Sequence, residues 1–223
     1  MFNSKNSQEV AHDLQKIPAK DNYKIITLDM KDLYVNLPTQ NIVNITKFWL
    51  KINNQNQTIT EEILYLLKII LEQNYFQYED RFYKPNKGIA MGSPISSTLA
   101  DIYLQFFERI YLKHHLETKN IIYYKRYVDD LIIIYDHTKI DADTIYDIIN
   151  NIDVHLEFKL TEEEKCTTNY LDLSIQRKHN EFQMNIYRKP TFIDITIHYM
   201  SNHPHSHKMA GFHFYSMAWA LQV

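Results

Sequence analysis

Two adjacent aspartates, Asp129 and Asp130, interrupt the apolar and aromatic run 123–135. β-branched and aromatic residues on both sides of a short polar pair are typical of two strands joined by a tight turn, with the acids at or beside its tip. A third acid, Asp29, closes the short apolar strand pattern 23–28. Acids are common in turns for purely structural reasons. Carboxylates at two strand ends, however, could also meet side by side in one sheet.

Carboxylates gathered at strand ends would bind hard divalent cations. Magnesium takes oxygen ligands, typically one or two carboxylates completed by substrate phosphates and water. Two such ions about 3.5 to 4 Å apart can activate an attacking oxygen and stabilise a leaving oxygen in phosphoryl or nucleotidyl transfer. The three aspartates therefore predict metal-assisted transfer chemistry.

A glycine-containing stretch, 88–97, precedes the aspartate pair. The chain has three glycines, and two of them, Gly88 and Gly92, lie in this stretch. In a chain so poor in glycine, this placement suggests a backbone that turns sharply or lets a ligand come close. The alternative is a plain loop before a helix.

Several predicted elements must position these residues. Ser96 or Ser97 is expected to cap a helix that runs to about His115. Its predicted buried stripe is Leu99, Ile102, Tyr103, Phe106 and Ile110. The other predicted elements are helices at 10–17, 40–51, 60–71 and 141–151, a hairpin at 75–84, and strands at 155–160, 169–176 and 182–187. This order predicts an α+β fold in which an antiparallel sheet is backed by helices.

Length and composition place the chain among ordinary globular proteins. Its 223 residues, 45% of them hydrophobic and 23% charged, suffice for one domain with a core. The sequence contains no apolar run of about 18 residues, so we expect no membrane span. It also lacks the apolar core of a signal peptide, so we do not expect secretion. The single cysteine, Cys166, suits a reducing, intracellular setting.

The charge is unevenly distributed. A net charge of −3 argues weakly against a free-standing nucleic-acid binder, which usually has a basic surplus. Acids are concentrated in 141–164, however, whereas basic residues and histidines are concentrated in 177–208. The C-terminal third is therefore basic.

With these segments in order, the chain resembles the palm of a reverse transcriptase. Segment 28–34 is similar to the family's first metal-binding motif, and segment 88–94 to the motif that lies against the template and the incoming nucleotide. Segment 127–130, Tyr-Val-Asp-Asp, matches the family's signature box. Segment 169–173 is similar to the short hairpin that grips the primer. Together with the C-terminal segment described next, the similarity extends from about residue 10 to about residue 215.

A narrower resemblance concerns the C-terminal part. Segment 187–194 and the pairs and short runs at 197–198, 201–204 and 207–208 are similar to the segment that follows the palm in Penelope-like retroelements. The resemblance implies an RNA-directed DNA polymerase that is intracellular and acts in the nucleus. Its partners would be an RNA template, a DNA primer and deoxynucleoside triphosphates.

The family resemblance also implies roles for the metal-binding acids. Asp29 and Asp129 would bind two Mg²⁺ ions, with Mn²⁺ as a possible substitute, and Asp130 would be a third carboxylate close by. The 3′-hydroxyl of the primer would attack the α-phosphate of the deoxynucleoside triphosphate.

Further residues are assigned to the nucleotide. By resemblance, Tyr34 would lie under the sugar and exclude a 2′-hydroxyl, although a packed aromatic ring is the alternative. Gly92 and Ser93 would let the backbone approach the nucleotide and the templating base. Lys165 is a candidate general acid for pyrophosphate, and its alternative is one charge in the solvated run 162–165.

The basic C-terminal residues are expected to contact the nucleic-acid backbone. Arg188, Lys189 and Lys208 are the candidates, because phosphate binding draws on Lys and Arg. Four histidines in 198–207 could instead suggest zinc, but no cysteine accompanies them.

The expected organisation is a poorly structured lead at 1–22, a palm with partial fingers at 23–177, and a basic C-terminal extension at 178–223. No fingers motif is recognisable before Asp29, a thumb is largely absent, and no GIY-YIG endonuclease is present. A truncated, inactive palm that at most binds RNA is therefore an alternative. A telomerase-like or intron-type enzyme is another, which agrees with the acids but not with segment 187–208.

Overall fold

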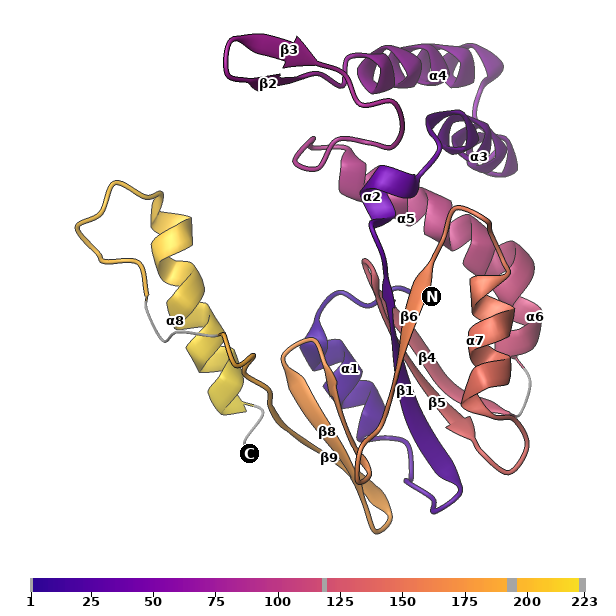
Figure 1. Ribbon diagram of the computed structural model, residues 1–223, viewed down its shortest axis with the longest axis vertical. Helices are drawn as coiled ribbons and strands as arrows, with labels where there is room; N and C mark the ends of the chain where they lie inside the picture. The colour runs from indigo at the N-terminus through magenta and orange to yellow at the C-terminus, as the bar shows by residue number, and fades with distance from the viewer. Residues whose placement is uncertain (1, 118–119, 192–195, 221–223) are drawn as a thin grey trace.

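The computed structural model describes residues 2–117, 120–191 and 196–220, without the side chains of 213–220. Segment 187–194, quoted above, therefore lies partly outside the described residues. A four-stranded sheet forms the centre of the molecule, in the order β4-β5-β1-β6, and all neighbouring strands are antiparallel (Figure 1). Its strands are β1 (Tyr23–Met30), β4 (Ile121–Tyr127), β5 (Asp130–Asp136) and β6 (Phe158–Glu162).

Both faces of this sheet are covered. On β5, Leu131, Ile133 and Tyr135 belong to one hydrophobic core, whereas Ile132 and Ile134 belong to another. Successive side chains of a strand point to opposite faces, so a strand buried on both sides needs a continuous apolar run. Full burial of each such aliphatic side chain contributes about 1.5–3 kcal/mol.

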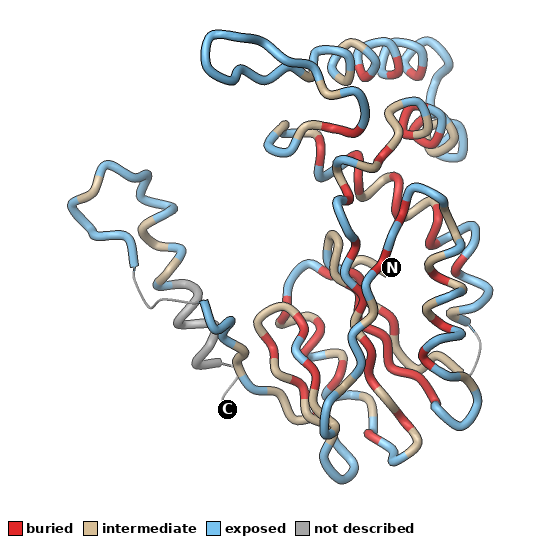
Figure 2. The backbone as a smooth tube through the Cα atoms, in the orientation of Figure 1, coloured by how far each residue is buried: buried red, intermediate tan, exposed pale blue. Residues whose placement is uncertain are grey.

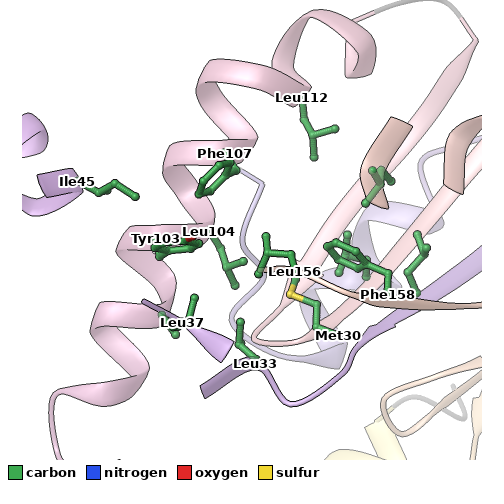
Figure 3. Close-up of a cluster of buried hydrophobic side chains, with 14 of the residues drawn as sticks. Met30, Leu33, Leu37, Ile45, Tyr103, Leu104, Phe107, Leu112, Leu156 and Phe158 are labelled. Atoms are coloured by element: carbon green, nitrogen blue, oxygen red, sulfur yellow. The ribbon is translucent and has the colours of Figure 1, made fainter. Parts of the chain in front are cut away.

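Helices cover the first face. Their side chains point toward Met30 and Phe158 of the sheet in Figure 3, where Tyr103, Leu104 and Phe107 come from α5. The elements on this face are α5 (Ser96–Phe107), a π-helical turn η1 (Glu108–Leu112), α6 (Lys113–Leu116) and α7 (Ala142–Asn150). Asp141 caps α7, since its Oδ1 accepts the Thr144 N–H at 2.7 Å.

A second layer covers the other face. It contains helix α1 (Ser7–Leu14) and a three-stranded antiparallel sheet of β7 (Thr167–Tyr170), β8 (Leu173–Lys178) and β9 (Glu181–Ile186). Figure 2 shows that buried residues concentrate in these layers around the central sheet. The predicted antiparallel sheet backed by helices is therefore confirmed.

The N-terminal lead is more ordered than expected. The side chain of Asn6 caps α1 by accepting the Glu9 N–H at 2.9 Å, and Val10 and Leu14 are fully buried against the sheet. Apolar residues four positions apart share one helix face, which explains this packing. The domain boundary expected between residues 177 and 178 does not coincide with a break in the structure, because both residues belong to β8 and pair with β9.

A smaller unit lies beyond the end of the central sheet. It contains α2 (Leu33–Asn36), α3 (Thr39–Ile52), α4 (Gln57–Glu72) and the hairpin β2 (Phe76–Tyr78) and β3 (Arg81–Tyr83). In Figure 1 this hairpin projects away from the sheet, and all six of its strand residues are exposed. Helix α4 begins earlier than its expected start at Thr60, because Asn56 caps it by accepting the Thr58 N–H.

The long helix before β4 differs from its prediction in its N-cap residue and in which side chains are buried. Neither Ser96 nor Ser97 is its N-cap; Ile95 occupies that position, and the Ser96 hydroxyl donates to the Ala90 carbonyl. Ile110, assigned to the buried stripe, is half exposed, because it lies in the π-helical turn η1. A π turn inserts an extra residue and so rotates the following side chains out of register.

Two strand predictions also need correction. The strand expected at 169–176 is a hairpin, β7 to β8, whose turn contains Leu171 with a positive φ of 54°. The strand expected at 155–160 begins later, at Phe158, after a turn in which Asp153 accepts the His155 N–H. Helix α8 (His205–Ala220) follows β9 and stands apart from the sheet in Figure 1.

None of the helices in the described part of the chain is long and apolar enough to span a membrane.

Candidate active site

The structure brings the three predicted aspartates to one end of the central sheet. Asp29 on β1 is paired in register with Asp130, the first residue of β5. Directly opposed residues of antiparallel strands have Cβ atoms about 4.5–5.5 Å apart and project from the same face. Asp129 lies in the two-residue turn between β4 and β5, and its carbonyl accepts the Met30 N–H at 3.1 Å.

Asp29 and Asp130 lie on the face covered by the second sheet. Asp29 shares this face with Ile25, and Asp130 shares it with Ile132, both members of the core under β7, β8 and β9. From β7, the buried Tyr170 donates its hydroxyl to the Asp130 carbonyl at 3.1 Å. The predicted primer-grip hairpin therefore contacts the backbone of the aspartate pair.

Burial and the neighbouring acids perturb the pKa of Asp130. Burial raises the pKa of its carboxyl to about 6, and the negative charges of Asp129 and Asp29 contribute to the rise, while Lys189 opposes it. Like charges held together disfavour ionisation. The site therefore contains a concentration of negative charge that a cation would offset.

Replacing Asp130 with asparagine is expected to stabilise the fold at pH 8. The raised pKa means that the folded state binds more protons than the unfolded state between about pH 4 and 6, so stability falls as the pH rises through this window. Asp130→Asn removes this penalty. Because the site is partly exposed to solvent, we expect a gain of about 1 kcal/mol at pH 8 that disappears at pH 4. Urea unfolding at both pH values, without divalent cations, measures it.

Asp80→Asn provides the control. Asp80 is an exposed residue in the turn of the β2–β3 hairpin, which projects away from the central sheet in Figure 1. The free energy of unfolding should not rise in Asp130→Asn at pH 4, nor rise equally in Asp80→Asn. Either rise would contradict the explanation that the ionised Asp130 carboxylate destabilises the fold.

Two lysines lie near the carboxylates. Lys159 on β6 is paired with Asp29, so β1 has an acid on one side of Asp29 and a lysine on the other. Lys189 follows β9, and its charge acts on Asp130. Lys159 is not among the predicted site residues. The only indication in the sequence that it faces the site is its alternation with apolar residues along β6.

The structure does not bring Lys165 to this site. Lys165 lies in the turn between β6 and β7, two residues after Glu163, whose N–H donates to the carbonyl of Ile25. Ile25 is four residues before Asp29 on β1, which corresponds to about 13 Å at the usual rise of a strand. Its assignment as a general acid is therefore not supported by this geometry.

The glycine-containing loop packs against the turn after β1. The N–H of Ile89 donates to the Tyr34 carbonyl at 2.8 Å. Gly88 has φ +81°, and a Cβ there would lie 2.5 Å from the Val35 carbonyl oxygen. Tyr34 itself is half-buried on α2, with its ring against the main core.

Gly92 and Ser93 lie farther along the same loop. Gly92 has φ +92°, and a Cβ there would meet no atom within 4 Å, so its surroundings are open. Ser93 lines a cavity of about 300 Å³ between the end of α4 and the start of α5. Close approach of a ligand to Gly92 is thus sterically allowed.

The remaining basic candidates differ in position. Arg188 is exposed beside Lys189, directly after the segment in which the Tyr187 N–H donates to the Asp172 carbonyl. Lys208 lies on α8 with its Nζ 5.6 Å from the centre of the Tyr199 ring. The charge of Lys189 acts on Asp130, whereas Lys208 lies on α8, which stands apart from the central sheet in Figure 1.

The donor set fits magnesium. In the described part of the chain no group of three or more His, Cys, Asp or Glu side chains forms a ready-made metal cage. Mg²⁺ does not require one, since it is usually held by one or two carboxylates together with substrate phosphates and water. Asp29 and Asp130 provide a cross-strand pair, with Asp129 adjacent in the turn.

A buried ionic cluster that no sequence pattern predicted lies behind the turn. Arg126 on β4 is 1% exposed and pairs with Glu108 at 2.7 Å and with Asp101 at 2.8 Å, both from the helix packed on the first face. The only sign of this cluster in the sequence is a charged residue, Arg126, within an apolar strand pattern beside segment 127–130. Its partners could not be identified, because they are distant in sequence.

Comparisons with known proteins agree with this arrangement. A family profile described as reverse transcriptase (RNA-dependent DNA polymerase) matches residues 2–214. A search of curated protein sequences gave no match. Among solved structures, the chain resembles a telomerase from Candida tropicalis truncated from its C-terminal domain, with a TM-score of 0.63 and 19% identity. It also resembles a Candida albicans telomerase in complex with a fragment of telomeric RNA, with a TM-score of 0.67 and 14% identity.

These alignments cover 82% and 83% of the chain but only 41% and 36% of the two telomerases. The chain thus spans about two fifths of the length of these proteins, and at such identities the likeness concerns the fold alone. The family profile covers nearly the whole chain, including the aspartate turn and the loop that carries Gly88 and Gly92. The chain therefore belongs to the reverse transcriptase family of RNA-dependent DNA polymerases.

Proposed function

We propose that this chain is the palm of an RNA-directed DNA polymerase that extends a DNA primer on an RNA template. The observation that carries the proposal is the register of the sheet, which pairs Asp29 with Asp130 and puts Asp129 in the adjoining turn. The family profile across residues 2–214 supports the same activity.

Magnesium held by Asp29, Asp129 and Asp130 would supply activation of the primer hydroxyl and stabilisation of the leaving pyrophosphate. The chain itself contributes geometry and charge. The sheet fixes two of the carboxylates across neighbouring strands, and the open surroundings of Gly92 leave room for a nucleotide. Lys189 adds a positive charge beside the site, suited to a nucleic-acid phosphate.

We further propose that the enzyme belongs to a retroelement of the Penelope-like type and acts in the nucleus. The resemblance of segment 187–208 supports this origin, since it lies outside the palm motifs that reverse transcriptases share. The telomerase structures do not argue for a telomerase instead, because their likeness concerns the fold.

Primer extension on an RNA template tests the function. The folded chain, supplied with magnesium and deoxynucleotides, is expected to extend the primer, and a variant with Asp129→Ala and Asp130→Ala is expected not to. Circular dichroism shows whether the variant keeps its fold. Equal extension by both would refute the carboxylate assignment, and extension by neither would refute the claim that this chain alone carries the activity.

Tyr34→Ala is expected to admit ribonucleotides. Tyr34 lies on α2 directly after the strand of Asp29, and the Ile89 N–H fixes its backbone. A ring that blocks a 2′-hydroxyl sterically contributes about 10- to 200-fold in discrimination, the range typical of pocket sterics. The ratio of kcat/KM for deoxynucleotides and ribonucleotides should fall by that factor. Tyr34→Phe keeps the ring and should keep the ratio, while an unchanged ratio in Tyr34→Ala would remove Tyr34 from this role.

A further inference from the structure

Arg126 is a buried cation with several acceptors. Its Nε donates to Glu108 Oε1 at 2.7 Å, and its Nη2 donates to Glu108 Oε2 at 3.2 Å and to Asp101 Oδ1 at 2.8 Å. Its Nη1 points elsewhere and donates to the carbonyl of Val128 at 3.2 Å. A guanidinium can make all these bonds at once because its donors form a rigid planar fork.

Val128 is the residue that needs such support. It is the first of the two residues in the turn between β4 and β5, and its φ is +53°. Glycine normally occupies this conformation in a tight hairpin turn, and a β-branched residue is strained there. Strained backbone persists only where the surroundings hold it in place. The hydrogen bond from Arg126 to the Val128 carbonyl is one such restraint.

Packing alone does not fix the turn on this side. A cavity of about 260 Å³ adjoins it, lined by Val128, Arg126, Asp101 and Ser97 among others. On the other side, the Asp129 carbonyl accepts the Met30 N–H from β1. Hydrogen bonds from the Met30 N–H of β1 and from Arg126 thus hold the two turn residues, and the Tyr170 hydroxyl bonds to the Asp130 carbonyl where β5 begins.

The guanidinium is itself anchored by three parts of the fold. Glu108, in the π-helical turn, also accepts the Tyr124 hydroxyl at 3.0 Å, and Asp101 on α5 also accepts the Asn3 amide at 3.0 Å. The backbone of Arg126 bonds to Phe2 and Ser4 of the N-terminal segment. π turns are frequent at functional sites. This one places the Glu108 carboxylate against Arg126 of β4.

We propose that Arg126 is a positioning residue that holds Val128 in its strained conformation and thereby keeps Asp129 and Asp130 against Asp29. This role rests on the proposed function of the three aspartates. Because Arg126 is 1% exposed, it would act through its hydrogen bond to the turn and not by contact with substrate or metal.

A purely stabilising ion pair is the alternative, and the chain offers a matched control for it. Arg177 pairs with Glu163 at 3.0 Å, and both side chains are largely buried. The Glu163 carboxylate accepts the Ile25 N–H, so this pair lies toward the other end of β1 from Asp29. Arg126→Lys and Arg177→Lys each keep a charge and lose the fork.

The first measurement needs neither metal nor substrate. The amide of Met30, which donates to the Asp129 carbonyl, reports on the turn in hydrogen exchange. It should exchange faster than in the parent protein in Arg126→Lys and at the parent rate in Arg177→Lys, with both variants compared at equal global stability. An unchanged Met30 amide in Arg126→Lys would overturn the proposal.

The second measurement is Mn²⁺ affinity, followed by electron paramagnetic resonance on the full chain without nucleic acid. Residues that orient metal ligands typically contribute 10- to 100-fold in affinity or activity, so Arg126→Lys should weaken Mn²⁺ binding and lower kcat by about that factor. The KM for primer–template should stay within about twofold, since the buried Arg126 side chain offers no surface to a nucleic acid. Equal losses in Arg177→Lys would overturn the proposal.

The outcomes separate this inference from the proposed function. If the parent binds Mn²⁺ and the two variants differ as expected while no chain extends a primer, the function fails and the role of Arg126 stands. If the parent extends primers and Arg126→Lys matches it, the function stands and the role fails. Should Arg126→Lys not fold, Asp101→Asn takes its place, because Asp101 is one-third exposed and holds only Nη2.

Discussion

Asp29→Asn is expected to lower the rate of nucleotide addition by about 10³-fold. Metal-assisted stabilisation of transition-state charge is worth several kcal/mol, and each 1.36 kcal/mol is a factor of ten in rate. Asparagine keeps the shape of the side chain, so the pairing of β1 with β5 and β6 should persist. Single-turnover primer extension at saturating magnesium measures the loss, and thermal unfolding checks the fold.

Asp32→Asn is the matched control for this prediction. Asp32 lies three residues further on, is exposed, and has a positive φ of 48°, which asparagine tolerates well. It should keep its rate within a factor of about two, because it is not part of the cross-strand pair with Asp130. If the two variants lose activity equally, or if Asp29→Asn retains more than a tenth of the rate, Asp29 is not a metal ligand.

Gly88→Ala is expected to destabilise the protein by about 3 kcal/mol or more. Its Cβ would lie 2.5 Å from the Val35 carbonyl oxygen and 2.6 Å from that of Tyr34, distances at which the backbone must move. The positive φ of +81° adds strain for any residue with a Cβ. Urea unfolding measures the loss, and discrimination against ribonucleotides should weaken as well, since the clash displaces Tyr34.

Gly92→Ala separates the two causes. Gly92 has a similarly positive φ of +92°, but a Cβ there meets open space. We therefore expect a loss of only about 1 kcal/mol, the usual cost of a left-handed conformation for alanine. Equal losses at the two positions would show that backbone conformation alone matters and that the contact with Tyr34 and Val35 does not.

The local elements of the site could be predicted because their signals are local. Apolar residues on both sides of Asp129 and Asp130 mark two strands and a turn, and Asp29 ends another strand pattern. These signals indicate that the acids could meet, but they do not predict the register that pairs Asp29 with Asp130. Register between distant strands is set by packing on both faces of the sheet, which no local pattern contains.

The positions of Lys165 and Arg126 could not be predicted for the same reason. The assignment of Lys165 rests on its position between two motifs, yet β6 runs antiparallel to β1 and carries it toward the opposite end of the sheet. Arg126 has no predicted role, because its partners come from a helix and from the N-terminal segment. The π turn at Glu108 rotates the helix stripe in a way that no 3.6-residue pattern shows.

The topology of the central sheet has a consequence for how the protein is made. Strand β1 is synthesised before both of its partners, because β5 follows 101 residues later, counted from Asp29 to Asp130, and β6 later still. At the usual 5–20 residues per second, the ribosome needs roughly 5–20 s to span that interval. Throughout it, the apolar β1 has neither neighbour. Nascent chains stalled before β5 should therefore bind chaperones, and those extended beyond β6 should release them.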